Sequence, residues 1–129
     1  MEPKPRCDVP AIRVVMMPRD TNGDGTIFGG VILSYIDQAG YVEARRQASH
    51  KYVTVMMNRV EFKQPVYVGD VLSLYAETTR IGRSSIGIHV NVLAERKIDP
   101  GAAIPVTEAE LVFVAVDDQG HPRPVAESS

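Results

Sequence analysis

The stretch that decides the fold runs from Thr26 to Gln47 and reads T-I-F-G-G-V-I-L-S-Y-I-D-Q-A-G-Y-V-E-A-R-R-Q. A glycine pair opens it, an apolar run follows, and basic residues close it. About sixteen residues of this kind form a helix about 25 Å long at ~1.5 Å per residue. Because this helix is apolar on nearly every side, we expect it to be a buried central helix with other elements packed around it.

The middle of this run carries a single carboxylate, Asp37. Burying an unpaired carboxylate costs several kcal/mol or forces it to bind a proton, so Asp37 is predicted to be either functional or tightly hydrogen-bonded. At the helix start, Gly29 and Gly30 leave the first N–H groups uncovered by side chains. Because these groups carry the positive end of the helix dipole, they can stabilise an oxyanion.

Size and charge exclude several classes of protein. A chain of 129 residues is long enough for one domain with a core of its own, without disulfides or metals. Its 44% hydrophobic and 23% charged residues are typical of a globular protein. A net charge of −2 gives no electrostatic reason to expect nucleic acid or a membrane surface as a partner.

The N-terminal residues contain no apolar segment of the signal-peptide type, and no stretch is apolar over eighteen residues. We therefore expect neither export nor a membrane span, and a cytoplasmic location. The lone Cys7 cannot form an internal disulfide, which fits a reducing compartment.

The segments around the helix read as strands. A short apolar run over 11–17 lies between Pro10 and Pro18, which favours a strand over a helix. After the helix the apolar period changes from 3.6 to 2, with a turn around Gly82 and Arg83 that predicts a hairpin. The further strands are predicted over 52–62, 71–81, 86–92 and 104–116.

The order β-α-β-β-β-β predicts an α+β fold, in which a curved antiparallel sheet wraps around one long central helix. We expect three parts: a flexible leader over 1–10, a single domain over 11–118 and an exposed tail over 119–129.

The loop from Asp20 to Ile27 matches the first eight positions of a calcium-binding EF-hand loop. The twelfth position, however, is Val31 instead of Glu, the ninth is Phe28, and Pro18 closes a strand where a helix should precede the loop. A plain turn of Asx and Gly residues is therefore favoured, and a calcium-binding protein is kept as an alternative of a different class.

Other motifs of chemistry are weak or missing. His50, His89 and His121 do not cluster with other ligands at metal spacing, so no metal site is predicted. No serine-nucleophile motif and no complete nucleotide-binding glycine motif occurs. The hairpin tip around Arg83 and its two serines could contact phosphate or simply be a solvated turn.

Three motifs in order resemble one family. They are D-T-N-G-D-G-T-I-F-G-G-V-I-L-S-Y-I-D-Q-A-G, then V-E-F-K-Q-P-V-Y-V-G-D-V-L, then G-R-S-S-I. Together they resemble the hotdog-fold acyl-coenzyme A thioesterases of the bacterial and cytosolic acyl-CoA hydrolase type, over about residues 11–118.

The resemblance implies a hotdog fold and hydrolysis of acyl-CoA to free acid and CoA, with no cofactor beyond the CoA of the substrate. It also implies a homodimer that joins two sheets edge to edge, often assembled into tetramers or hexamers. The helix aspartate of the family falls on Asp37, and its oxyanion-binding amides fall on Gly29 and Gly30. Relatives commonly have Asn or Asp at the position of Thr26, where this side chain helps to place the water of the reaction. In this chain the hydroxyl of Thr26 would have to hold that water. Contacts to the substrate and its CoA are implied for Phe28, Val68, Gly69, Gly82, Arg83, Ser84 and Ser85.

Asp37 would either attack the thioester directly or activate water as a general base. Seven residues separate Gly30 from Asp37, which is about 10 Å along a helix at ~1.5 Å per residue. Both groups must reach one carbonyl, so we expect the oxyanion site to come from one subunit and Asp37 from its partner. Two alternatives on the same fold are a hydratase or dehydratase, which typically uses a histidine, and a non-enzymatic acyl-CoA sensor.

Overall fold

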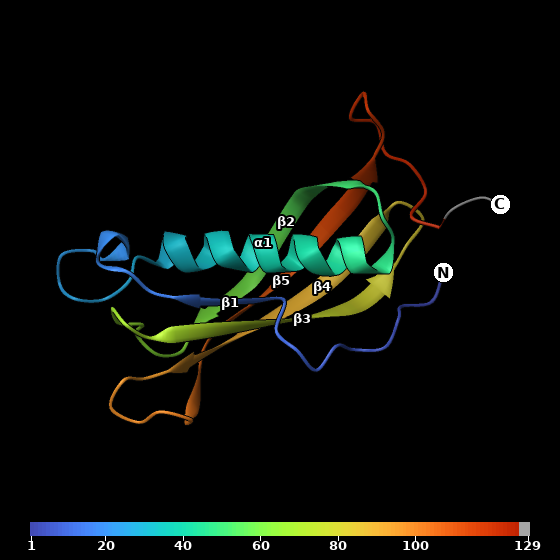
Figure 1. Cartoon of the computed structure of the whole chain (residues 1–129). Coiled ribbons are helices and arrows are strands. Elements are labelled where there is room, and N and C mark those ends of the chain that lie inside the picture. Colours follow the sequence, from blue (N-terminus) through green and yellow to red (C-terminus); the bar gives the residue numbers. More distant parts are fainter. Residues whose placement is uncertain (127–129) are drawn as a thin grey trace.

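The structure, a computed structural model, describes residues 1–126 and consists of one long helix lying on a five-stranded antiparallel sheet (Figure 1). The predicted order of elements and the predicted fold class are confirmed. In chain order the elements are β1 (Ile12–Val15), the short 3-10 helix η1 (Pro18–Asp20), α1 (Gly29–Gln47), β2 (Lys51–Phe62), β3 (Val71–Ile81), β4 (Ser85–Glu95) and β5 (Ala103–Val116).

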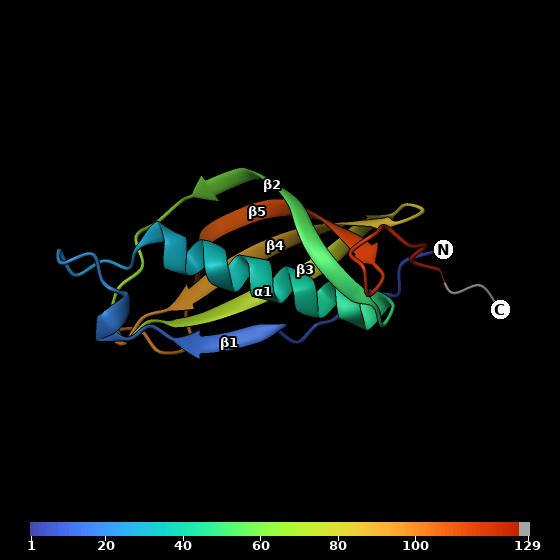
Figure 2. The same cartoon turned by 90° about the horizontal axis from the view of Figure 1, so that it is seen from above.

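The strands lie in the order β1-β3-β4-β5-β2, and each neighbouring pair is antiparallel. The predicted hairpin between β3 and β4 is present, and the N–H of Gly82 donates to the carbonyl of Ser85 at 2.8 Å. The sheet curls around α1, which lies across its inner face with β1 and β2 at the two edges (Figure 2).

The core fills the space between the inner face of the sheet and α1. Alternate residues of β4, β5 and the first half of β3 point inward and are buried, as the period of 2 predicted. The inward residues of β5 that the sequence identified are all buried, namely Ala109, Leu111, Phe113 and Ala115.

Only one face of α1 is buried in the single chain, so the expectation of a helix covered on all sides is wrong. Ile32 and Ile36 pack into the core, whereas Val42 on another face is 45% exposed. At Gly40 the helix lies so near the sheet that a Cβ atom would be 2.7 Å from the ring of Phe113. Only glycine allows the helix to lie this near the sheet.

The edge strand β2 is the most exposed strand of the sheet. Its pairing with β5 is interrupted between Thr54 and Met56 and again between Asn58 and Glu61. Several of its large apolar side chains are open to solvent in the single chain, namely Val53, Val55, Met56, Val60 and Phe62. An exposed apolar edge strand is a surface suited to pairing with another chain.

Most residues over 119–126 are exposed, as predicted, but the C-terminal segment is anchored to the domain at Val125. Val125 is fully buried, and its N–H donates to the carbonyl of Arg83 at 2.8 Å. His50 Nε2 lies 2.8 Å from the carbonyl of Val125 and must donate to it, because a carbonyl only accepts. The remaining tail residues, 127–129, lie outside the described residues.

The predicted leader, 1–10, contacts the C-terminal end of α1. The N–H of Lys4 donates to Gln47 Oε1 at 2.7 Å, and Arg46 donates to the carbonyl of Pro5 at 3.0 Å. Among residues 1–126, no helix is both long and apolar enough to cross a membrane.

Candidate functional site

Asp37 lies in the middle of α1 and faces the edge strand β2. Its side chain is half-buried and accepts a hydrogen bond from Thr54 Oγ1 at 2.5 Å. Thr54 lies two residues after the buried Tyr52 and therefore on the same face of β2, the face turned toward the helix. No sequence pattern indicates this partner, because two residues seventeen positions apart meet only through the docking of β2 against α1.

An open cleft of about 560 Å³ lies beside Asp37. Its walls come from α1, β2 and β1, and they are mostly apolar, with a carboxylate, an amide and a hydroxyl among them. The residues that line it are Ile12, Asp37, Gln38, Tyr41, Val42, Tyr52 and Thr54. A cleft of this composition suits an apolar ligand with one reacting polar group.

The start of α1 opens into another cleft, of about 330 Å³, which Gly29 and Phe62 both line. No hydrogen bond within residues 1–126 uses the N–H of Gly29 or Gly30 as a donor. A Cβ atom at Gly29 would lie 3.2 Å from the ring of Phe62, whereas one at Gly30 would meet nothing within 4 Å. The two amides therefore combine the positive end of the helix dipole with open space in front of it.

Thr26 lines the same cleft as Gly29. Its hydroxyl accepts a hydrogen bond from Asn22 Nδ2 at 2.6 Å, which leaves the hydroxyl proton free to be donated. Phe28 is the residue before the helix, is 54% exposed, and its carbonyl accepts from the N–H of Val31 at 3.1 Å.

The two clefts share no lining residue. Gly29 and Asp37 are eight residues apart on α1, which is about 12 Å along the axis at ~1.5 Å per residue. One carbonyl group therefore cannot be contacted by both within one chain.

The residues implied in CoA binding form two separate groups. Val68 and Gly69 lie in the turn before β3, near the start of α1, where Ile27 donates to the carbonyl of Val66 at 2.7 Å. The group from Gly82 to Ser85 lies beyond the other end of β3, about 33 Å away at ~3.3 Å per residue. Within one chain the two turns therefore lie at opposite ends of β3.

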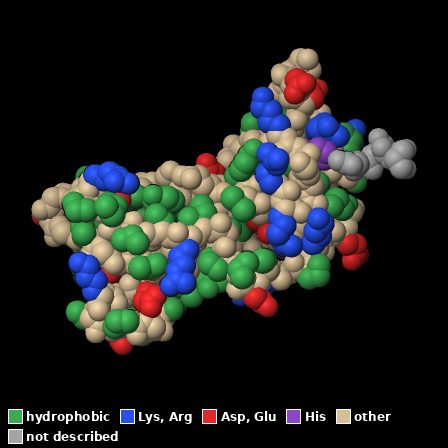
Figure 3. Space-filling view, viewed as in Figure 1, with side chains coloured by type: hydrophobic (Ala, Val, Ile, Leu, Met, Phe, Trp, Pro, Cys, Tyr) green, Lys and Arg blue, Asp and Glu red, His purple; other side chains and the backbone are tan. Residues whose placement is uncertain are grey.

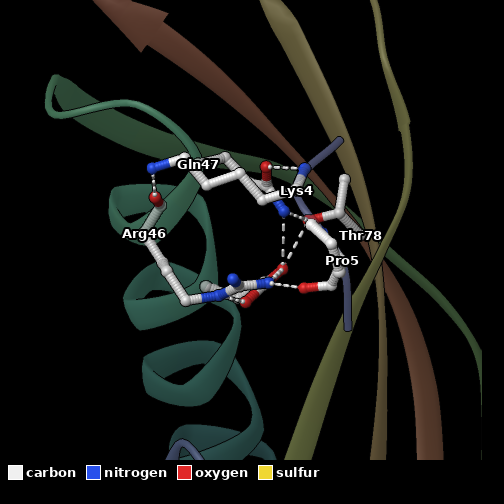
Figure 4. A network of polar contacts seen from close by, with 6 residues as sticks. Lys4, Pro5, Arg46, Gln47 and Thr78 are labelled. Atoms are coloured by element: carbon white, nitrogen blue, oxygen red, sulfur yellow. Dashed lines mark hydrogen bonds and ion pairs between the residues drawn. The ribbon is translucent and has the colours of Figure 1, made fainter. Parts of the chain in front are cut away.

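Glu43 is a second carboxylate on α1, which the sequence analysis overlooked, and it is far more buried than Asp37. It is 3% exposed and belongs to a network of polar contacts that joins α1 to β3 and the leader. Figure 4 shows the other members of this network, namely Lys4, Pro5, Arg46, Gln47 and Thr78. Arg46 Nε donates to it at 2.7 Å, Thr78 Oγ1 at 2.7 Å and Gln47 Nε2 at 3.0 Å. Burial alone would raise the pKa of Glu43, but these donors outweigh it and hold the pKa below its usual value. The signal available in the sequence was the Glu-x-x-Arg spacing of Glu43 and Arg46 on one helix face.

The loop that resembles a calcium site forms the turn expected from its Asx and Gly residues. Asn22 Oδ1 accepts from the N–H of Asp24 at 2.9 Å, and Asp20 Oδ2 accepts from the N–H of Met17 at 3.0 Å. Two of the oxygens that a cation would need thus bind backbone amides of the chain itself. In the part of the chain that the structure describes, no three His, Cys, Asp or Glu side chains are arranged to hold a metal ion.

Comparison with known proteins places this fold in a known family. The model of the thioesterase superfamily matches residues 24–99. The acyl-CoA thioester hydrolase YciA of Salmonella typhimurium is 39% identical over 116 residues, which are 88% of this chain and 87% of that protein.

Two solved structures are also similar. The hexameric hotdog fold thioesterase Cj0915 of Campylobacter jejuni has a TM-score of 0.86 and 40% identity, over 92% of this chain and 90% of that one. HI0827, a hexameric broad specificity acyl-coenzyme A thioesterase, has a TM-score of 0.87 and 37% identity, over 98% of this chain and 86% of that one. The chain therefore belongs to the thioesterase superfamily, among its hotdog-fold acyl-CoA thioesterases.

Proposed function

We propose that this protein hydrolyses the thioester of acyl-CoA to a free carboxylic acid and CoA, with Asp37 as the reacting carboxylate. The observation that carries the proposal is the placement of Asp37, which the hydroxyl of Thr54 orients at the edge of a mostly apolar cleft. The names of the relatives support the substrate class, since YciA is an acyl-CoA thioester hydrolase and HI0827 a broad specificity acyl-CoA thioesterase.

In the general-base route, Asp37 takes a proton from water and the resulting hydroxide attacks the thioester carbonyl carbon. The carbonyl oxygen becomes an oxyanion, which the N–H groups of Gly29 and Gly30 stabilise. The C–S bond then breaks, and the CoA thiolate takes up the proton. In the nucleophilic route, Asp37 itself attacks the carbonyl carbon, the C–S bond breaks and CoA leaves as the thiolate. Water then hydrolyses the acyl-carboxylate anhydride to the free acid and Asp37, and the proton released goes to the CoA thiolate.

The active site is shared between two subunits in this proposal. The carboxylate and the glycine amides of one chain open into separate clefts, so a two-fold partner has to supply one of them. The exposed apolar side chains of β2 support a dimer in which two sheets join at this edge. Further assembly to a hexamer is proposed from the hexameric relatives Cj0915 and HI0827.

Some assignments stay predictions. These are the water-placing role of Thr26, the contact of Phe28 with the substrate, and the cytoplasmic location. The predicted CoA contacts also stay predictions; they come from two turns, one at Val68 and Gly69 and the other at Gly82–Ser85. Because the two turns lie at opposite ends of β3, they can contact the same CoA molecule only if they come from different subunits.

The test is release of free thiol from a panel of acyl-CoAs, from short to long and aromatic, with Asp37→Asn beside the wild type. Asn keeps the size of the side chain and can accept from Thr54, but it is neither a base nor a nucleophile. We expect kcat to fall by about 10²–10⁴-fold, the range for loss of a positioned acid-base group. Full activity in Asp37→Asn would refute the assignment, and an inactive wild type on every acyl-CoA would refute the proposed function.

A further inference from the structure

A basic pocket of about 460 Å³ lies at the C-terminal end of α1. Three elements supply its cations: Arg45 comes from α1, Lys51 from β2 and Arg123 from the C-terminal segment. Lys and Arg side chains gather on this end of the molecule, near the chain termini (Figure 3). Neither the family resemblance nor the proposed chemistry at Asp37 uses these three residues.

None of the three cations pairs with a carboxylate within residues 1–126. Arg45 makes only long contacts with neutral groups, at 3.3 Å to Tyr41 Oη and 3.5 Å to Ser49 Oγ. Arg123 Nε likewise reaches the carbonyl of Pro124 at 3.5 Å. Guanidinium groups held this loosely can exchange their contacts for the stronger, charge-assisted bonds of an anion.

Backbone pairing fixes the positions of Lys51 and Arg123 relative to each other. Arg123 donates its N–H to the carbonyl of Ala115 at 2.9 Å, and the residue before it forms a bridge with Val116. Val116 in turn pairs with Lys51, so Lys51 and Arg123 flank the same position of β5. Burial raises the pKa of Tyr52 to about 12 while the charges of Arg45 and Arg123 oppose this rise, so both cations act on one ring.

The basic pocket adjoins the cleft of Asp37, because Tyr41 lines both. Asp37, Tyr41 and Arg45 follow one another at intervals of four residues and therefore lie on one face of α1. From Asp37 to Arg45 is about 12 Å along the axis at ~1.5 Å per residue. In an acyl-CoA, the phosphate groups lie at the far end of the pantetheine arm from the thioester.

We propose that Arg45, Lys51 and Arg123 bind the phosphate groups of the substrate, a nucleoside 3′-phosphate 5′-diphosphate joined to pantetheine. This inference rests on the proposed function, and it places the pantetheine arm along the face of α1 that runs from Asp37 past Tyr41. It assigns the C-terminal segment to substrate binding, through Arg123.

Two carboxylates, Asp117 and Asp118, also line the pocket, and they differ in whether backbone N–H groups already bind them. Asp117 Oδ1 accepts the N–H groups of Gln119 and His121, each at 2.9 Å, so its charge is directed into its own turn. Asp118 is exposed and has no such partners in residues 1–126. It therefore opposes phosphate binding, and removing its charge should strengthen that binding.

The experiment compares two substrates with the same thioester, butyryl-CoA and S-butyryl-pantetheine, which lacks the phosphates. The measured quantity is the ratio of kcat/KM for butyryl-CoA to kcat/KM for S-butyryl-pantetheine. We expect Arg123→Gln and Lys51→Gln each to lower this ratio about 10- to 150-fold, as loss of one charge-assisted hydrogen bond implies. Asp118→Asn should raise the ratio. Arg13→Gln, which removes an equal charge on β1, is the matched control and should leave the ratio as in the wild type.

Adenosine 3′,5′-bisphosphate serves as a probe for the same pocket. It should inhibit butyryl-CoA hydrolysis competitively, and more weakly in Arg123→Gln; inhibition that is not competitive would point to a separate nucleotide site and overturn the inference. A ratio unchanged in both Arg123→Gln and Lys51→Gln would also overturn it while leaving the proposed function intact. If the wild type hydrolyses neither substrate, the proposed function fails and the inference fails with it.

Discussion

Gly29 has two separate reasons to be glycine. Its N–H, the first of the helix, is the proposed oxyanion donor, and its missing side chain leaves room for the ring of Phe62, which a Cβ would approach to 3.2 Å. Substitutions can separate these two roles. Proline is tolerated in the first turn of a helix but has no N–H to donate, so it removes the proposed donor while keeping the helix.

We expect Gly29→Pro to lower kcat by about 10²–10³-fold, as loss of one oxyanion donor does in other enzymes. Gly29→Ala places the same Cβ atom against Phe62 but keeps the N–H group, so it measures the steric effect alone and should lose less. Steady-state hydrolysis of one acyl-CoA by both variants, with circular dichroism to verify the helix, gives the comparison. Equal rates in the two variants would show that this amide is not a donor in the transition state.

At the scale of the element, α1 is held at its C-terminal half by Glu43 and its donors from Arg46, Gln47 and Thr78. Because the pKa of Glu43 is lowered from 4.5 in the folded state, the ionised form contributes stability that is fully present above that value. The contribution is lost as the pH falls through the lower pKa of the folded state.

We therefore expect Glu43→Gln to lower the free energy of unfolding at pH 7 by about 1–3 kcal/mol, the cost of weakening a buried charged hydrogen bond. The difference from the wild type should shrink as the pH falls below 4.5, because protonation removes the same charge from the wild type. Urea unfolding of both proteins at several pH values measures this difference in the free energy of unfolding. Glu110→Gln removes an exposed partner of Arg59 at 3.6 Å and should change stability far less. A difference that is independent of pH would contradict the assigned charge state of Glu43.

Much of the fold could be predicted from the sequence, because the helix and the strands depend on local patterns of residues. The helix, the β3–β4 hairpin and the inward residues of β5 follow from apolar period and turn residues. The contact between Thr54 and Asp37 could not, since it depends on the register with which β2 docks. The anchoring of Val125 could not either, because a polar, proline-bearing segment around it gives no periodic signal.

At the scale of the whole molecule, the proposed division of the active site between subunits makes a quantitative prediction. Asp37→Ala and Gly29→Pro are each expected to be nearly inactive as pure oligomers. After unfolding and refolding a 1:1 mixture, half of the dimers are hybrids and each hybrid has one complete site. We expect activity of about one quarter of the wild type, from random pairing of the two chains.

The control for this mixture is the double variant, with both substitutions in one chain, mixed with Asp37→Ala. It cannot assemble a complete site in any combination and should stay inactive. Absence of recovery in the first mixture, with dimers verified by light scattering, would argue for a site within one chain.

The contact of Gly40 with Phe113 has a consequence for how such a protein can change its substrates. The helix rests on the sheet with no side-chain spacer at that point, only three residues from Asp37. We expect an added methyl group there to push the helix away from Phe113 and to shift the carboxylate with it, although residue 40 is buried and lines neither cleft. Evolution or a designer can therefore retune the geometry of the reaction from inside the core, through a residue that a search limited to the cleft walls would never sample.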